Sequence, residues 1–423
     1  MNGEDPVQPG RRRFLATAGL ATAGLAAGGV AAPALAKAQA SDADQAEPFF
    51  GKHQAGVATK PQRHLYFAAF DLVAEQRDEV IALLRAWTDA AARMAKGQTA
   101  AELGEDPAAA PPDSGDVLGL PANRLTFTFG FGSGLFIKDG KDRYGLAQRR
   151  PEALIELPRF NGDQLVPERS GGDLCVQICA DDQQVALHAA RQLQRLADPA
   201  AKMRWAQTGF QTSYGSKDTP RNLMGFKDGT INPATDDQSV MDQVVWVGDE
   251  GGWMKHGTYM VARPIRIALE HWDHMKLGFQ EQVVGRHKLS GAPLGGANEF
   301  DKLDLDAVDK DGNSVIPENA HARLAAPESN DGAQILRRGY SYDNGLNFTT
   351  ERWPPWRQGY ELDAGLMFVC YQRDPRSGFV KVFDKVSKFD MMNQFVTHVG
   401  GGLFACPAGA AEGQYVGQGL FEA

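Results

Sequence analysis

The stretch HLYFAAFD, residues 64–71, is short, apolar and rich in aromatic side chains. Such a run predicts a β-strand that is buried in a core. In residues 76–94, which follow it, apolar side chains recur with the period of a helix, as Val80, Leu84 and Trp87 show. Together the two segments predict a strand that leads into an amphipathic helix, which is the beginning of a β-α-β unit.

Strand-like and helix-like segments alternate through the rest of the chain in two similar sets. In the first set, further strands are predicted at residues 125–132, 173–179 and 210–213, and a helix at 181–196. In the second set, strands are predicted at residues 258–267, 366–372 and 401–407, and helices at 268–279 and 380–395. Two such β-α-β-β-α-β units in tandem predict an α+β fold. Its two ferredoxin-like halves would place their antiparallel sheets face to face, as in a dimeric α/β barrel.

Length and charge limit the domain organisation and the class of partner. The chain has 423 residues and a formal net charge of -9. This length accommodates two domains, and the acidic balance argues against a nucleic-acid partner, since such proteins usually carry a basic face. We predict a signal peptide at residues 1–40, a linker at 41–62, an N-terminal ferredoxin-like half at 63–218 and a C-terminal ferredoxin-like half with the functional site at 219–423.

The N-terminal segment has the three parts of an export signal. The motif RRRFL at residues 11–15 is followed by an apolar run rich in Ala and Gly at 16–35 and by small-residue cleavage sites within 34–40. Paired arginines before Phe-Leu are typical of a twin-arginine signal, which exports folded proteins. A retained membrane anchor is the alternative, but the mild hydrophobicity of the run favours export. We therefore expect a periplasmic or otherwise exported protein that does not span the membrane after processing.

The stretch GFKDGT, residues 225–230, places Asp228 in a loop with a glycine on either side. Glycines have no Cβ, so the backbone can turn tightly and a flat ligand can come close to it. Such a loop can direct a carboxylate at a reactive centre. It can equally be a turn with a solvated Asp, and the loop alone does not decide between the two.

His321 and Arg337 stand in the long polar segment at residues 285–341. Iron in a haem needs one strong axial base, which a histidine supplies. Splitting a peroxide on the opposite face needs a group that moves a proton and a fixed cation that stabilises the departing oxygen. An acid, a histidine and an arginine are the residue types for this chemistry, although their spacing alone leaves a structural histidine open.

Several motifs together make the chain similar to the dye-decolorising peroxidases. GFKDGT at 225–230 resembles that family's G-x-x-D-G motif, His321 matches its proximal haem ligand, and LRRGY at 336–340 resembles its distal-arginine stretch. FTFGFG at 127–132 and GLMFVCYQ at 365–372 are also similar to the family. With its twin-arginine motif, the chain resembles the exported subgroup, the deferrochelatase/peroxidase component of bacterial ferrous-iron uptake systems.

This resemblance implies one haem b per chain, held mainly by the C-terminal half. His321 would bind the iron from the proximal side, and Asp390 would accept a hydrogen bond from it. Asp228 would be the distal acid and base, and Arg337 the distal cation beside the cofactor. Three further residues would lie against the haem edge: Gly229, Thr230 and Ile231.

The resemblance also implies an activity and a set of partners. We expect a haem-dependent peroxidase that reduces hydrogen peroxide with one-electron oxidation of organic donors, and that also releases iron from haem as a deferrochelatase. The alternative is an exported haem-binding protein for iron acquisition, in which peroxidase activity is incidental. The expected partners are peroxide, organic donors or haem, other components of an iron uptake system, and a second copy of the chain in a homodimer.

The chain departs from the exported subgroup in two places. Ala-Pro-Glu stands at residues 326–328, where the subgroup often has Asn-Pro-Arg, which questions a basic contact to a haem propionate near Glu328. The loop at residues 352–357 has no counterpart in the family pattern. Its Trp353 and Trp356 could relay electrons to bulky substrates, or they could simply bury area, as most aromatic side chains do.

Overall fold

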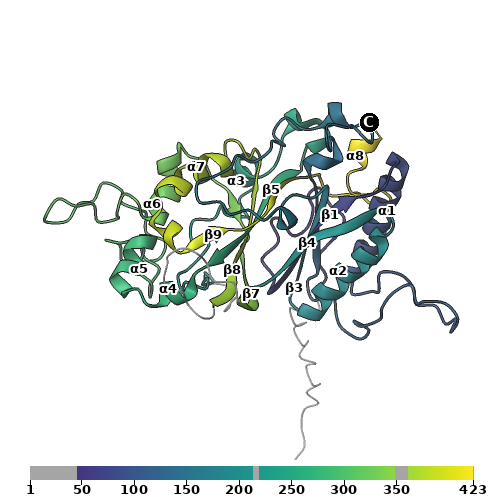
Figure 1. Cartoon of the computed structure of the whole chain (residues 1–423), viewed down its shortest axis with the longest axis horizontal. Coiled ribbons are helices and arrows are strands. Elements are labelled where there is room, and N and C mark those ends of the chain that lie inside the picture. Colours follow the sequence, from purple (N-terminus) through teal and green to yellow (C-terminus); the bar gives the residue numbers. More distant parts are fainter. Residues whose placement is uncertain (1–44, 213–218, 348–360, 423) are drawn as a thin grey trace, which may run out of the picture. The chain divides into compact units, whose positions relative to one another are not determined.

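The structure is a computed structural model that describes residues 45–212, 219–347 and 361–422. Trp353, Trp356 and the predicted signal peptide lie outside the described residues. The helices and strands of the first half follow the order β-α-β-β-α-β (Figure 1). They are β1 (His64–Leu72), α1 (Arg77–Met94), β2 (Thr126–Phe131), β3 (Leu174–Ala180), α2 (Gln183–Ala197) and β4 (Ala201–Phe210).

The second half repeats this order with additional short elements. Its strands are β5 (Thr258–Ile267), β6 (Leu336–Arg337), β7 (Tyr340–Asn347), β8 (Glu361–Gln372), β9 (Val396–His398) and β10 (Gly402–Cys406). Its helices are α3 (Gln238–Val244), α4 (Leu269–Asp273), α5 (Leu277–Val284), α6 (His321–Ala325), α7 (Phe379–Phe389) and α8 (Gln418–Phe421).

The strands of the two halves join into one closed ring. Within the first half the strand order is β4-β1-β3-β2, and within the second it is β10-β5-β8-β7, which is the same ferredoxin-like order in each. The halves meet at two antiparallel junctions, where Phe210 of β4 pairs with Ser341 of β7 and Ala405 of β10 pairs with Phe131 of β2. The expected fold of two ferredoxin-like halves with facing sheets is therefore confirmed.

Strands β1, β2, β3 and β5 are buried on both faces over most of their length, which explains why β1 is an apolar run. Phe67 and Ala69 of β1 belong to the core cluster inside the ring, whereas Ala68 and Phe70 belong to the cluster beneath the helices. In the first half, that outer cluster is filled by α1 and α2 (Figure 1). The corresponding outer face of the second half is covered by α6 and α7, and a cavity remains between them and the strands.

Local sequence signals set the helices of the first half. The Asp182 carboxylate accepts hydrogen bonds from the backbone N–H groups of Gln184 and Val185, at 2.7 and 3.1 Å, and this N-cap fixes the start of α2. Trp87 of α1 is buried, and its indole N–H donates to the Leu193 carbonyl of α2 at 2.8 Å. This bond joins the two helices over the sheet.

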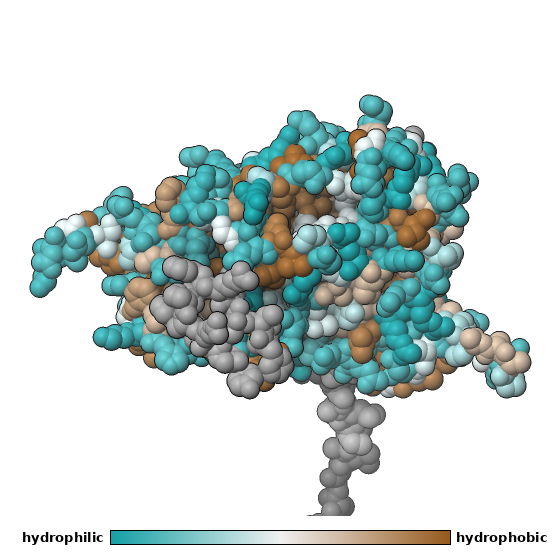
Figure 2. Space-filling view, viewed as in Figure 1, coloured by the Kyte–Doolittle hydropathy of each residue, from teal (hydrophilic) through white to brown (hydrophobic). Residues whose placement is uncertain are grey.

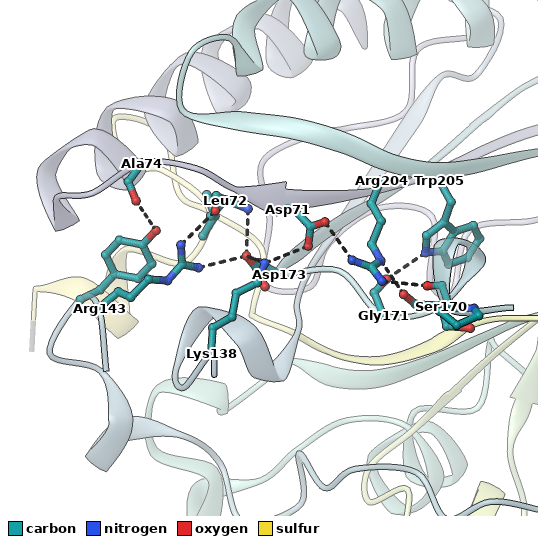
Figure 3. A network of polar contacts seen from close by, with 12 residues as sticks. Asp71, Leu72, Ala74, Lys138, Arg143, Ser170, Gly171, Asp173, Arg204 and Trp205 are labelled. Atoms are coloured by element: carbon teal, nitrogen blue, oxygen red, sulfur yellow. Dashed lines mark hydrogen bonds and ion pairs between the residues drawn. The ribbon is translucent and has the colours of Figure 1, made fainter. Parts of the chain in front are cut away.

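A polar network holds the first half together at the edge of its sheet (Figure 3). The buried Asp173 carboxylate accepts hydrogen bonds from Lys138 at 2.8 Å and from Arg143 at 3.0 Å. Lys138 also pairs with Asp71 of β1 at 3.0 Å, and Asp71 pairs with Arg204 of β4 at 2.9 Å. The network thus ties two strands to the loop at residues 133–150 without leaving a buried charge unpaired.

Three predicted elements differ from the structure, and one strand was not predicted. The last strand of the first half is β4, whereas the prediction placed it at residues 210–213. The prediction failed because charged and apolar residues alternate along Ala201–Phe210, which is typical of a strand with one exposed face. The predicted helix 268–279 is two helices, α4 and α5, since the Gln280 side chain donates to the Trp272 and Met275 carbonyls between them. The predicted helix 380–395 ends at Phe389, and β7 was not predicted.

No helix in the described part of the chain combines the length and the apolar character that crossing a bilayer needs. The face in Figure 2 is mostly hydrophilic, and its hydrophobic side chains gather in separate patches.

Candidate active site

The cavity of the second half has one wall of strands and one of helices. Six side chains of β5, β8 and β9 form the first wall, and seven of α6 and α7 form the second. These are Ile265, Ile267, Leu366, Phe368, Val396 and His398, facing His321, Ala322, Ala325, Phe379, Val382, Phe383 and Val386. Residues 226–231 and Arg337 also line the cavity. All six site residues predicted from the sequence therefore line one cavity: Asp228, Gly229, Thr230, Ile231, His321 and Arg337.

The loop that carries Asp228 is held by its own backbone. Gly225 has φ +84° and Gly229 has φ +124°, conformations that favour glycine over any residue with a Cβ. The Asp228 N–H donates to the Pro220 carbonyl at 2.8 Å. A Cβ on Gly229 would meet no atom closer than 3.7 Å, so this glycine is required by the turn rather than by lack of space.

Arg337 lies opposite Asp228 at the end of β6. Its Nη1 atom lies 2.6 Å from Asp228 Oδ1, and the two side chains are 30% and 26% exposed. β6 pairs with β8, with Arg337 opposite Cys370. The next residue, Arg338, turns into the core instead, where its guanidinium donates to Thr59 and Gln62. Strand alternation thus gives the two adjacent arginines different surroundings.

Asn232 connects the Asp228 loop to the backbone of Arg337. Its side-chain Nδ2 donates to the Arg337 carbonyl at 2.8 Å, and its Oδ1 accepts from the Arg337 N–H at 3.1 Å. One amide therefore fixes the relative position of two residues that are 105 apart in the chain. This role could not be predicted from local sequence, because it depends on where β6 lies.

His321 is the first residue of α6, and Asp390 follows the end of α7. The His321 Nδ1 atom lies 2.6 Å from Asp390 Oδ2, and the Asp390 side chain is only 1% exposed. Burial lowers the pKa of His321, but the attraction and the hydrogen bond of Asp390 outweigh it, so the pKa is raised. No hydrogen bond of Nε2 is found among the described residues, and His321 lines the cavity.

Two further polar residues of the cavity wall were not predicted. His398 pairs with Ile265 in the β9–β5 register, which places both side chains in the wall. Burial, followed by repulsion from Arg263, lowers the pKa of His398 well below its ordinary value, so the imidazole is neutral. Arg286 is also buried, and its Nη1 donates to the carbonyls of Gly291 and Glu299. At residues 326–328, where the sequence departs from the pattern of the exported subgroup, Pro327 lines the cavity and Glu328 does not.

Comparisons with known proteins agree with this fold. The model described as Dyp-type peroxidase, N-terminal, matches residues 54–211, and the model described as Dyp-type peroxidase, C-terminal, matches residues 219–411. Fold and matched models define the class as a haem-dependent peroxidase. The chain belongs to the Dyp-type peroxidase family.

Relatives of known name align over most of their length. The chain is 38% identical to a dye-decolorizing peroxidase of Thermobifida fusca, over 91% of this chain and 86% of that protein. It is 36% identical to a deferrochelatase of Escherichia coli, over 98% and 97% of the two chains. Among solved structures, an oxyferrous/water mixed complex of DtpA from Streptomyces lividans is 42% identical, with a TM-score of 0.82 over 90% of this chain and 99% of that one.

The residues of the cavity fit a haem. Two apolar walls suit the faces of a flat macrocycle, because ligand sites are mostly apolar with a few placed polar groups. The polar groups present are an imidazole whose other nitrogen is held by a buried carboxylate and an acid–arginine pair. A ligating histidine typically has such a carboxylate behind it. The donor set therefore suits iron that arrives within a porphyrin.

Proposed function

We propose that this chain is a haem b peroxidase in which His321 binds the iron and the pair of Asp228 and Arg337 acts on hydrogen peroxide. The observation that carries the proposal is the 2.6 Å contact between Asp228 and Arg337, which line the same cavity as the pair of His321 and Asp390. Each pair joins a residue from a loop or helix end to one far away in sequence. The cavity thus presents one base for a metal and one acid–cation pair.

The proximal role falls to His321 through its Nε2 atom. Asp390 accepts the Nδ1 proton, which fixes the tautomer and the ring orientation and leaves Nε2 as the ligand. The raised pKa of His321 means that its ring is a stronger base than an isolated imidazole. A more basic ligand donates more electron density to the iron.

The distal role falls to Asp228 and Arg337. When bound, the haem would supply the redox chemistry for splitting the bond between the peroxide oxygens and for one-electron oxidation of donors. The Asp228 carboxylate takes the proton from the first peroxide oxygen and delivers it to the outer one, which leaves as water. The Arg337 guanidinium stabilises negative charge on that departing oxygen and holds the carboxylate in place.

Binding of the cofactor would use the loop after Asp228 and one cation. Gly229, Thr230 and Ile231 line the cavity and would lie against the macrocycle edge. Arg286 also lines it, and it is the residue we propose for an acidic substituent of haem b. This assignment replaces the basic contact that the family pattern would place near Glu328.

A haem titration followed by a peroxidase assay tests the proposed function. Wild-type protein should bind one haem per chain, with a Soret band of a histidine-ligated iron, and should oxidise an organic donor only when peroxide is present. His321→Ala should weaken haem binding, and Glu318→Gln, an exposed residue three positions earlier, should not. A wild-type protein that binds no haem, or an unchanged His321→Ala variant, would contradict the proposal.

Release of iron from haem is a second candidate function. Its support is the similarity to proteins named deferrochelatase over nearly their whole length. Incubation of the pure protein with haem under reducing conditions, followed by fluorescence of metal-free porphyrin, separates the two. Porphyrin formation above that of a protein-free control would support iron release. Peroxidase activity without porphyrin would leave the peroxidase as the function.

We also propose that the chain is exported by the twin-arginine route and works as a homodimer. The support for export is the motif RRRFL at residues 11–15 with the apolar run behind it. Replacing Arg11 and Arg12 by Lys should retain the protein in the cytoplasm, as fractionation and an immunoblot would show.

Light scattering of the purified protein tests the dimer, and a monomer at micromolar concentration would contradict it.

A further inference from the structure

The segment at residues 285–320, which precedes His321, contacts the Asp228 loop through one acid, Glu299. One carboxylate oxygen of Glu299 pairs with the Lys227 ammonium, and the other accepts a hydrogen bond from the Thr230 hydroxyl at 3.1 Å. Lys227 and Thr230 stand on either side of Asp228 in the chain. Glu299 therefore binds the loop at Lys227 and at Thr230, which lie on either side of the distal acid Asp228.

The Glu299 carboxylate is itself held in place. Its side chain is 9% exposed, and it belongs to the lining of neither cavity that contains Asp228. The Glu299 carbonyl accepts a hydrogen bond from Arg286 at 2.9 Å, and Arg286 also donates to Gly291. Burial tends to raise the pKa of Glu299, but the hydrogen bonds from Lys227 and the neighbouring threonines outweigh it, so this pKa is lowered. The carboxylate stays ionised in mildly acidic solution.

The same segment also holds the helix of His321. Arg323, in the first turn of α6, donates hydrogen bonds to the Leu305 carbonyl at 2.7 Å and the Ile316 carbonyl at 3.2 Å. One inserted segment thus supports the loop with the distal acid at Glu299 and the proximal helix at Arg323. Long loops of this kind in compact domains are commonly functional.

The charges around Asp228 come from several elements. Arg337 of β6 pairs with it directly, Lys227 precedes it in the loop, and His321 of α6 interacts with it across the cavity. Arg286 lies within electrostatic reach of both Arg337 and Glu299. Arg337 and Lys227 are permanent cations beside this carboxylate, and Glu299 is the anion that offsets Lys227.

We propose that Glu299 is a positioning residue that fixes the Asp228 loop and offsets the charge of Lys227, and so sets the pH range in which the distal pair reacts with peroxide. The inference rests on the proposed peroxidase function. Asp228 accepts a proton only as a carboxylate, so the reaction slows as the solution becomes acidic enough to protonate it. An extra uncompensated cation favours the carboxylate form and moves that acid limb to lower pH.

A set of charge variants tests this inference by the pH dependence of the reaction with peroxide. In Glu299→Gln, Lys227 is no longer offset, and the acid limb should move down by about half a unit to one unit. In Lys227→Gln, a cation is lost, and the limb should move up. The double variant should return close to the wild-type profile, which loosening of the loop alone would not produce. Glu318→Gln, on the same segment but exposed, is the matched control.

Hydrogen exchange of the haem-free protein gives a second readout. The Asp228 N–H bonds to Pro220 and the Asn232 N–H to Gly229, so exchange at residues 225–232 should be faster in Glu299→Gln than in Glu318→Gln. An unchanged acid limb in both single variants, or unchanged exchange, would overturn the role of Glu299. If the wild-type protein itself fails to react with peroxide, the proposed function is wrong, and the exchange measurement still decides whether Glu299 holds the loop.

Discussion

His321 and Asp390 are joined by a contact of 2.6 Å between Nδ1 and Oδ2, although 69 residues separate them in the chain. Asp390 has a second bond, because its Oδ1 accepts the N–H of Met392 at 2.7 Å and caps the start of the short helix at Met391–Gln394. The Asp390 carboxylate is therefore held by the backbone N–H of Met392 as well as by the imidazole of His321. This rigid partner is what makes His321 a strong and oriented base.

Asp390→Asn should weaken this base while leaving the fold intact, since an amide oxygen can still cap the Met392 N–H. We expect haem affinity to fall by about 10- to 100-fold and the reduction potential of the iron to rise. Haem transfer to an acceptor protein and a spectroelectrochemical titration measure the two effects. Asp384→Asn, an exposed change on the same helix, is the control, and equal potentials in the two variants would contradict the role of Asp390.

Asn232→Ala should separate the two distal residues, because both hydrogen bonds to the Arg337 backbone are lost. We expect a fall in the rate with peroxide of about tenfold or more, since small misplacements of reacting groups are costly. The free energy of unfolding should fall by about 1–3 kcal/mol, because buried polar groups lose partners. Rapid-mixing absorption measures the rate and denaturant titration the free energy of unfolding, with the exposed Asn298→Ala as the control. Identical peroxide rates in the two variants would contradict the role of Asn232 in positioning Arg337.

His398→Phe should change how stability depends on pH. In the unfolded chain an imidazole binds a proton near pH ~6.5, whereas the pKa of the folded His398 lies well below its ordinary value because of burial and Arg263. Below pH ~6.5 the unfolded state therefore binds more protons, and the wild-type protein loses stability as the pH falls, by up to about 1.4 kcal/mol per pH unit.

This loss should be absent in His398→Phe, whose ring can keep the edge contact with Phe383 at 4.6 Å between centroids. Denaturant unfolding of the haem-free proteins between pH ~4.5 and ~7.5, around the ordinary histidine value, measures the two slopes. The variant should show the shallower acid slope. Parallel curves would mean that His398 is not held neutral by the fold.

Much of the fold could be predicted from local pattern, and the failures have physical causes. The strand at residues 258–267 was predicted with its full length, because both of its faces are buried and its apolar run is continuous. β7 was missed because its sequence YSYDNGLN is polar and contains a turn-like Asp-Asn-Gly, and only pairing with β8 and β4 makes it a strand. Strand pairing is a tertiary property that short windows do not contain.

The candidate site divides in the same way. Asp228, His321 and Arg337 could be proposed from motifs, since each stands in a short stretch with family resemblance. Asn232 and Glu299 could not, because their partners lie 105 and about 70 residues away, and neither stands in an unusual local pattern. His398 lies between the predicted helix at 380–395 and the predicted strand at 401–407, and only the register with Ile265 places it in the cavity wall.

The central claim is that Asp228 and Arg337 act on peroxide above a haem held by His321. Rapid mixing of haem-loaded protein with hydrogen peroxide tests it most directly, with wild type, Asp228→Asn and Arg337→Leu compared at equal haem content. We predict that each variant keeps its haem and that the spectral change on mixing slows by about 10²- to 10⁴-fold. Rates equal to wild type in both variants would contradict the claim.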